Sequence, residues 1–226
     1  MTSRTADVRG IYFVTDPDQT VSVTRADPID ATARYVRAAV DAGVTMVQVR
    51  WKNADAGPVL DLVAKCAEEI AASPGSALLV VNDRIDVFLA ARDLGTVVDG
   101  VHVGQTDLPV ETVRRLIGND AVLGLSATTQ ADLDALLALP TGTVDQIGVQ
   151  FRETATKSGT PGGLGVDGMA DYVRLSPVPV VAIGGITTAD LAPLAAAGVH
   201  QAAVVSAIAS AKDPADAAAK LVRCFH

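Results

Sequence analysis

The sequence predicts a (β/α)₈ barrel that forms a single domain over residues 1–226. Eight short runs rich in Val, Ile and Leu recur along the chain, and each breaks off on glycine, acidic, amide or basic residues. Stretches rich in Ala, Leu, Glu and Arg, long enough for helices, lie between the runs. The length fits one α/β barrel better than two small domains. Because such barrels carry their active site at the carboxyl ends of the strands, we expect the chemistry at the break points.

The eight runs are the predicted strands. They cover residues 10–16, 45–50, 78–83, 99–104, 121–126, 145–149, 178–185 and 201–206. Residues suited to a helix start predict several of the intervening helices. We expect Asp30 to open a helix over 31–42, Asp107 with Pro109 to open one over 110–117 and Thr188 to open one over 189–197.

Composition limits the classes of partner. The formal net charge of −8 at pH 7 argues against a nucleic-acid or anionic-membrane partner, because both require a basic face. An anionic small molecule remains possible if cations, backbone amides or a metal gather locally. The start of the chain lacks the apolar segment of a signal peptide, and no apolar run reaches the roughly 18 residues of a membrane span. We therefore expect a soluble, cytoplasmic protein.

Polar side chains alternate along the second predicted strand. Gln48, Arg50 and Lys52 share one face, and Val47 and Val49 share the other. The valines suit the face toward the helices, so the polar side chains should climb the inside of the barrel toward its mouth. Two cations there are costly without a partner, and a polyanionic ligand would supply one. Pairing of Arg50 or Lys52 with a structural carboxylate is the alternative.

The third and fourth predicted strands each end near an aspartate. Asp83 follows Asn82, and Asp107 follows the fourth strand. Since neighbouring strands end at the same mouth, two carboxylates near two cations predict a Mg²⁺ site completed by water and by phosphate oxygens of the ligand. A general acid/base pair remains an alternative, and Asp107 could instead cap the next helix. His102, between two valines, is expected to be a satisfied core residue.

The fifth predicted strand ends on Ser126, with Gly124 on the same face. Small residues at this point leave room above the barrel core for a ring. No histidine lies near Ser126 in the local sequence, so we expect a serine that forms hydrogen bonds and is not a nucleophile.

The last two strands predict a phosphate site. The seventh ends on Gly184 and Gly185, and the eighth ends on Val205 and Ser206. In this fold the loops after these two strands frequently bind phosphate through backbone N–H groups. Glycine lets a phosphate approach the backbone, because there is no Cβ to hold it away.

A second group of anion-binding side chains follows the sixth strand. The irregular segment 154–165 carries Thr154, Thr156 and Lys157, and we expect it to be mobile and to cover a substrate. A solvated loop is the alternative. Two phosphate sites in one cavity indicate a reaction that joins two phosphorylated substrates.

Taken in order, these segments resemble the thiamine-phosphate synthase family. The motif Gln48-Val49-Arg50-Trp51-Lys52 is similar to the family's Gln-x-Arg-x-Lys, and the resemblance extends from about residue 10 to about residue 215. The other matching segments are residues 12–16, 81–84, 100–107, 154–157, 182–186 and 205–208.

The resemblance implies a (β/α)₈ barrel, often found as a homodimer. It also implies coupling of 4-amino-2-methyl-5-hydroxymethylpyrimidine diphosphate to 4-methyl-5-(2-phosphoethyl)thiazole, which gives thiamine monophosphate and pyrophosphate. No protein nucleophile is required, because a diphosphate leaves readily once a metal and cations neutralise it.

The resemblance also implies roles for individual residues. Asp83 and Asp107 would bind Mg²⁺. The diphosphate would be held by Arg50, Lys52, Asn82 and Lys157, and the aminopyrimidine by Gln48 and Ser126. The thiazole phosphate would be received by Thr154, Thr156, Gly185 and Ser206, with Val205 beside them. Of these, the candidates for catalysis are Arg50, Lys52, Ser126 and Lys157.

Two other functions stay open. A thiazole tautomerase-like isomerase on the same barrel would bind one phosphorylated thiazole and would need neither the two carboxylates nor the diphosphate cations. A non-catalytic barrel that binds thiamine phosphate would use the same mouth without turnover.

Overall fold

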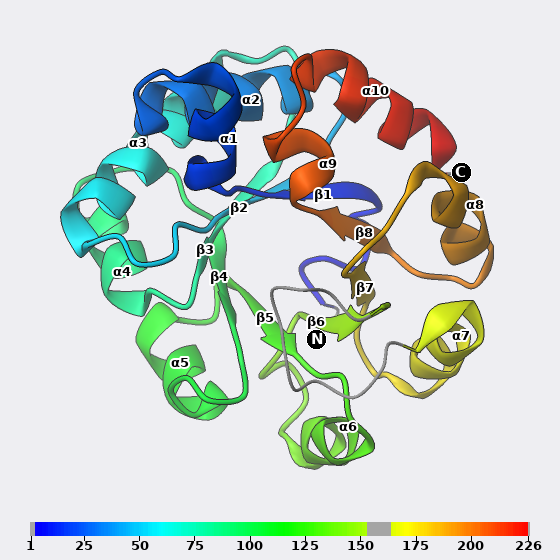
Figure 1. Ribbon diagram of the computed structural model, residues 1–226. Coiled ribbons are helices and arrows are strands. Elements are labelled where there is room, and N and C mark those ends of the chain that lie inside the picture. The colour runs from blue at the N-terminus through cyan, green and yellow to red at the C-terminus, as the bar shows by residue number, and fades with distance from the viewer. Residues whose placement is uncertain (1–2, 153–163, 226) are drawn as a thin grey trace.

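A ring of eight parallel strands forms the centre of the computed structural model, which describes residues 3–152 and 164–225. Each strand pairs with the next, and the last closes the ring on the first, with Gly10 opposite Gln201. Figure 1 shows the molecule viewed down the barrel, with the strands in the centre and the helices around them. The strands are β1 (Gly10–Val14), β2 (Met46–Val49), β3 (Leu78–Asn82), β4 (Gly100–Val103), β5 (Val122–Ser126), β6 (Gln146–Gln150), β7 (Val180–Ile183) and β8 (Gln201–Val204).

The predicted barrel and all eight predicted strands are confirmed. Most strands are shorter than predicted, because their polar last residues have already entered the connections. Arg50, Asp83 and Ser206 are of this kind and lie just beyond β2, β3 and β8. The sixth strand differs, since it continues to Gln150.

Two layers of apolar side chains surround the strand backbone. Tyr12, Met46 and Val122 belong to one cluster, which fills the inside of the ring. Val47 and Leu123, of the opposite parity, belong to a second cluster between strands and helices. Strands buried on both faces are written as continuous apolar runs, which is why the sequence reveals them.

The helices complete the alternation. Helix α1, which follows β1, and the short α9 were not predicted; Asp16 caps α1 by accepting a hydrogen bond from the N–H of Gln19 at 3.1 Å. The helices are α1 (Pro17–Thr24), α2 (Pro28–Asp41), α3 (Ala56–Ala72), α4 (Ile85–Asp93), α5 (Val110–Ile117), α6 (Gln130–Ala138), α7 (Gly165–Leu175), α8 (Thr188–Ala196), α9 (Ser206–Ala209) and α10 (Pro214–Cys224).

Two predicted helix starts are wrong. Helix α2 is capped by Asp27, not Asp30, because Asp27 Oδ1 accepts the N–H groups of Ile29 and Asp30 at 2.9 and 3.0 Å. A proline directly after Asp27 favours the earlier start. Helix α8 begins at Thr188 itself, which makes Thr187 its N-cap.

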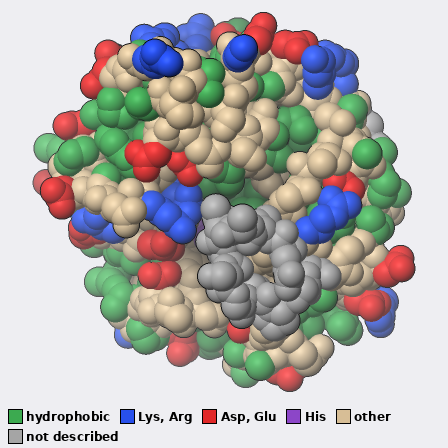
Figure 2. Space-filling view, in the orientation of Figure 1, with side chains coloured by type: hydrophobic (Ala, Val, Ile, Leu, Met, Phe, Trp, Pro, Cys, Tyr) green, Lys and Arg blue, Asp and Glu red, His purple; other side chains and the backbone are tan. Residues whose placement is uncertain are grey.

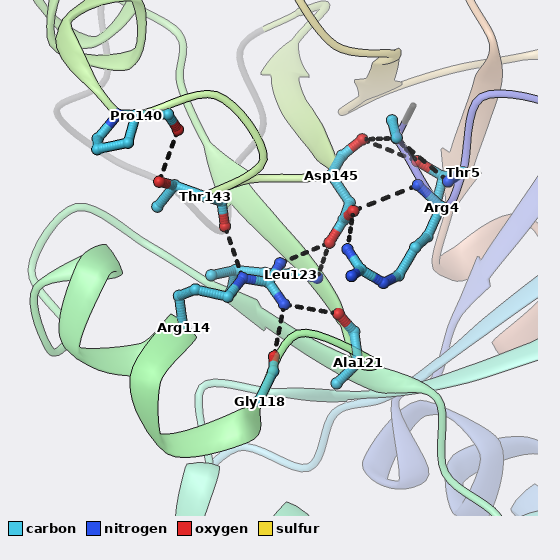
Figure 3. A network of polar contacts seen from close by, with 10 residues as sticks. Arg4, Thr5, Arg114, Gly118, Ala121, Leu123, Pro140, Thr143 and Asp145 are labelled. Carbon is cyan, nitrogen blue, oxygen red and sulfur yellow. Dashed lines mark hydrogen bonds and ion pairs between the residues drawn. The ribbon is translucent and has the colours of Figure 1, made fainter. Parts of the chain in front are cut away.

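A buried ion-pair network closes the amino-terminal end of the barrel (Figure 3). Asp145 directly precedes β6, and its side chain is only 1% exposed. It pairs with Arg114 of α5 at 2.6 Å and with Arg4 at 2.8 Å, and it accepts the N–H of Leu123 at 2.9 Å. Arg114 also donates to three main-chain oxygens at 2.8 to 2.9 Å. The buried charges of Asp145 and Arg114 therefore have their partners within the chain.

The segment predicted to cover a substrate lies almost wholly at residues 153–163, outside the described residues. The same holds for Thr154, Thr156 and Lys157. Within 3–152 and 164–225, no helix combines the length and apolar character needed to cross a bilayer.

Candidate active site

The end of β2 carries polar side chains into the barrel mouth, as alternation predicted. Gln48 is buried and donates from Nε2 to the Tyr12 hydroxyl at 2.7 Å. Arg50 is partly buried just beyond the strand, and Lys52 is exposed in the following turn. The alternative of a structural carboxylate is met in part for Arg50, since Asp16 Oδ2 lies 3.6 Å from Arg50 Nη1. This loose pair leaves donors of the five-donor guanidinium for a ligand.

The connection after β1 fixes the position of Arg50. Thr15 Oγ1 accepts the Arg50 N–H at 3.0 Å and donates to the Arg50 carbonyl at 3.2 Å. Asp16 is held in turn by Gln19, whose Nε2 donates to Asp16 Oδ2 at 3.0 Å. The Ser210 hydroxyl donates to Gln19 Oε1 at 2.8 Å. These supports could not be predicted from local sequence, because they join residues far apart in the chain.

Asp83 and Asp107 meet where β3 and β4 end. Asn82 Nδ2 donates to Asp83 Oδ2 at 2.6 Å, and the Gly104 N–H donates to Asp107 Oδ2 at 2.7 Å. Asp83 has a φ of 60°, a left-handed conformation uncommon outside glycine. Desolvation in the mouth, the negative charge of Asp107 and a hydrogen bond with it raise the pKa of Asp83 to about 6. The alternative that Asp107 caps α5 is not borne out, since α5 has no side-chain cap.

This pair of carboxylates fits a magnesium ion. Both groups are oxygen donors held by a single N–H each, and their mutual repulsion is what a divalent cation between them would relieve. Among the described residues no cluster of three or more His, Cys, Asp or Glu could hold a metal. Asp83 and Asp107 would supply two ligands, and water or ligand phosphate oxygens would complete the coordination.

Ser126 has a histidine partner that comes from a neighbouring strand and not from the local sequence. His102 Nε2 lies 3.0 Å from Ser126 Oγ, although the two residues are 24 positions apart. His102 and Gly124 are register partners in β4 and β5, so the imidazole reaches along β5 to its last residue. The hydrogen bonding predicted for Ser126 is present, and His102, predicted to be a satisfied core residue, is its partner. The pairing itself could not be predicted from the local sequence, because strand register joins the two residues.

The predicted phosphate loops also end at the mouth. Gly184 and Gly185, after β7, have φ values of 106° and 62°, which side-chain-bearing residues rarely adopt. Val205 follows β8 and precedes α9, and Ser206 is exposed at the start of that helix. These positions agree with the predicted cradle, and phosphate binding there stays a prediction.

An arginine that the sequence did not single out, Arg152, links the segment after β6 to Gly185 after β7. Arg152, just after β6, donates to the Gly185 carbonyl at 3.0 Å and forms a two-pronged pair with Asp190 of α8 at 2.7 and 2.5 Å. Asp190 also accepts the Thr187 hydroxyl at 2.7 Å. The Arg152 contact is the main cause that holds the pKa of Asp190 well below its ordinary value.

The described candidate residues all lie at the carboxyl ends of the strands. They are Gln48, Arg50, Lys52, Asn82, Asp83, Asp107, Ser126, Gly185, Val205 and Ser206. Figure 2 shows basic and acidic side chains next to one another near the centre of this face, with hydrophobic side chains recessed between them. Their location is settled by the barrel, whereas their roles stay predictions.

The fold and this mouth define the class: a (β/α)₈-barrel enzyme with charged groups gathered at the strand ends. The family model described as thiamine monophosphate synthase matches residues 11–208. The chain therefore belongs to the thiamine monophosphate synthase family, whose members are transferases of thiamine biosynthesis.

Individual relatives support this membership. The chain is 38% identical over 205 residues to a thiamine-phosphate synthase of Vibrio campbellii, with 90% of this chain and 92% of that protein covered. It is 41% identical over 191 residues to one of Corynebacterium efficiens, with 84% and 86% covered. The solved thiamine phosphate pyrophosphorylase from Pyrococcus furiosus superposes with a TM-score of 0.77 at 26% identity, covering 96% of this chain and 95% of that one. Orotidine 5'-phosphate decarboxylase from Pyrococcus horikoshii, at TM-score 0.66 and 12% identity over 94% of this chain and 98% of that one, shares the fold alone.

Proposed function

We propose that the protein is a thiamine-phosphate synthase that joins the aminopyrimidine diphosphate and the thiazole phosphate with release of pyrophosphate. The observation that carries the proposal is the convergence of Arg50, Asp83 and Asp107 at the ends of neighbouring strands. Two carboxylates beside a cation suit a metal-bound diphosphate better than they suit a single phosphate monoester. Family membership supports the same reaction.

In this proposal the residues at the ends of β2 and β3 hold the diphosphate. Arg50 offers a planar fork of donors, Lys52 a point charge at the rim and Asn82 an amide. Lys157, outside the described residues, is expected to add a second ammonium. These groups stabilise the negative charge that grows on the departing pyrophosphate, so they act more strongly in the transition state than in the substrate.

A magnesium ion held by Asp83 and Asp107 would add Lewis-acid stabilisation of the same leaving group. The proposed reaction requires no nucleophile from the protein. The electron-rich pyrimidine bears the positive charge once the carbon–oxygen bond breaks, and the thiazole nitrogen then forms the new carbon–nitrogen bond. Gln48 and Ser126 orient the aminopyrimidine, and holding both rings face to face supplies the remaining acceleration.

The thiazole phosphate is assigned to the opposite side of the mouth. Gly185, Val205 and Ser206 offer backbone N–H groups and a hydroxyl there, and Thr154 and Thr156 are expected to join them. Arg152 holds the Gly185 carbonyl through a hydrogen bond. A neutral cradle suits a phosphate that stays on the product, because it need not stabilise a leaving group.

Mg²⁺-dependent release of pyrophosphate, measured with both substrates present, tests the proposal. We expect release that needs both substrates and the metal. A tautomerase-like isomerase would release none, and a non-catalytic binding barrel would bind ligand without turnover. Either result would refute the synthase.

The quaternary structure implied by the family resemblance is also a proposal. We propose a homodimer, which sedimentation equilibrium of the purified protein would test. A monomer at every concentration would contradict it.

A further inference from the structure

The inner wall of the barrel contains a slot for one imidazole. Inward positions of this fold are usually filled by bulky aliphatic residues. Beside His102, however, the inward residues of the next two strands are Gly124 in β5 and Gly148 in β6. A Cβ added to Gly124 would stand 2.4 Å from His102 Nδ1, and one added to Gly148 would stand 3.1 Å from His102 Cε1. The ring therefore occupies the space that two side chains would otherwise fill.

Packing alone does not explain why an imidazole occupies this slot. Glycine weakens a strand interior, and a polar ring in place of two aliphatic side chains forgoes apolar burial. What the arrangement gains is direction, because the ring is confined between strands with Nε2 at 3.0 Å from Ser126 Oγ. Gln105 Nε2 also donates to the Ser126 carbonyl at 2.6 Å, which fixes the serine backbone.

We propose that His102 is a positioning residue, which acts through Ser126 to hold its hydroxyl in the orientation that aligns the aminopyrimidine. This inference rests on the proposed function and deepens it. A serine hydroxyl at a strand end rotates among staggered positions, and the contact with Nε2 selects one of them. Preorganisation of this kind favours the reactive alignment of the ring and leaves the second substrate untouched.

A double-mutant cycle on His102 and Ser126 tests the inference. His102→Leu fills the slot without hydrogen bonds, and Ser126→Ala removes the hydroxyl. We expect each single variant to lower kcat/KM for the pyrimidine diphosphate about tenfold or more, the scale of one well-aligned hydrogen bond. If His102 works through Ser126, the double variant should be within about twofold of Ser126→Ala, because coupled residues are not additive. The KM for the thiazole phosphate should stay within about twofold throughout.

Two further variants separate positioning from folding. His102→Gln keeps a side-chain nitrogen and should recover part of the activity lost in His102→Leu at similar thermal stability. Gly124→Ala should displace the ring and lower the same kcat/KM, whereas Gly57→Ala in α3, where an added Cβ meets nothing within 4 Å, should leave it unchanged. Effects of His102→Leu and Ser126→Ala that multiply, or no effect of His102→Leu, would overturn the inference.

The assay of the unaltered protein keeps the two proposals apart. If it releases no pyrophosphate, the synthase proposal fails, and the same cycle is read instead from calorimetric binding of the pyrimidine diphosphate alone. Non-additive losses of binding would then still support the positioning role. A protein that neither turns over nor binds this compound overturns both proposals.

Discussion

The two ends of the barrel carry the same types of charged side chain, aspartate and arginine, but differ in how these side chains are paired. At the amino-terminal end Asp145 lies between two arginines, and Arg114 directs its donors at a carboxylate and at main-chain oxygens (Figure 3). At the carboxyl-terminal end two like charges, Asp83 and Asp107, are brought together. The guanidinium of Arg50 there forms a loose ion pair with Asp16 at 3.6 Å. Charges satisfied within the chain stabilise the fold. Carboxylates that repel one another, and an arginine with unused hydrogen-bond donors, are candidates for binding a ligand.

The largest effect should come from breaking the satisfied end. Arg114→Met leaves Asp145 buried with Arg4 as its remaining cation, which should lower the free energy of unfolding by about 3–5 kcal/mol. Urea denaturation would measure the loss. The kcat of the molecules that remain folded should be unchanged, since the site lies at the opposite end. A loss below about 1 kcal/mol would mean that water already screens the pair.

Neutralising the other end should cost activity instead. Asp83→Asn and Asp107→Asn should each lower turnover at limiting Mg²⁺ by more than about tenfold, because each removes ligand charge. Unfolding stability should hold or rise, since each change relieves repulsion between the two carboxylates. Asp171→Asn, an exposed carboxylate of α7, is the matched control. Turnover that does not change at low metal would remove both residues from the proposed metal site.

The ion pair of Arg152 and Asp190 lies at the carboxyl-terminal end, beside Gly185, but like the pairs of Asp145 it is satisfied within the chain. Arg152→Gln should lower the free energy of unfolding only modestly near neutral pH, because the arginine is half-exposed and solvent screens its charge. The pKa of Asp190 is depressed in the folded protein, so its contribution is present above the unfolded pKa and is lost as the pH falls below it.

Stability curves of this variant and the unaltered protein between pH 7 and pH 2 would test that linkage. The two curves should converge toward acid, because protonation of Asp190 removes the interaction that the variant lacks. A stability difference that is constant with pH would show that the arginine contributes by packing over Phe151 and not by charge.

The smallest effect calibrates the others. Arg174→Gln removes an exposed pair with Asp171, in which both side chains are more than 60% exposed. We expect a change in unfolding free energy within about 0.5 kcal/mol and none in kcat. Urea denaturation beside Arg114→Met would check it. A loss comparable to that of Arg114→Met would end the contrast between satisfied buried charges and surface charges.

Much of the site could be predicted because strand ends of a parallel barrel meet by topology alone. Once eight apolar runs are recognised, Arg50, Asp83 and Ser206 must face one mouth, whatever the details of packing. The partners of these residues could not be predicted in this way. The contacts of Asp16 with Arg50, and of Arg152 with Asp190, depend on side-chain rotamers and loop paths that no local pattern encodes.

The sequence by itself determined the barrel, the end at which the candidate residues gather and the family, because the apolar period and the ordered motifs are properties of the chain. Only the tertiary structure decided that Ser126 meets His102 and that two glycines make room for the imidazole. Those facts depend on strand register, which sets which residues of neighbouring strands lie opposite each other. Register is fixed by packing the whole ring at once, and so it cannot be read from any one segment.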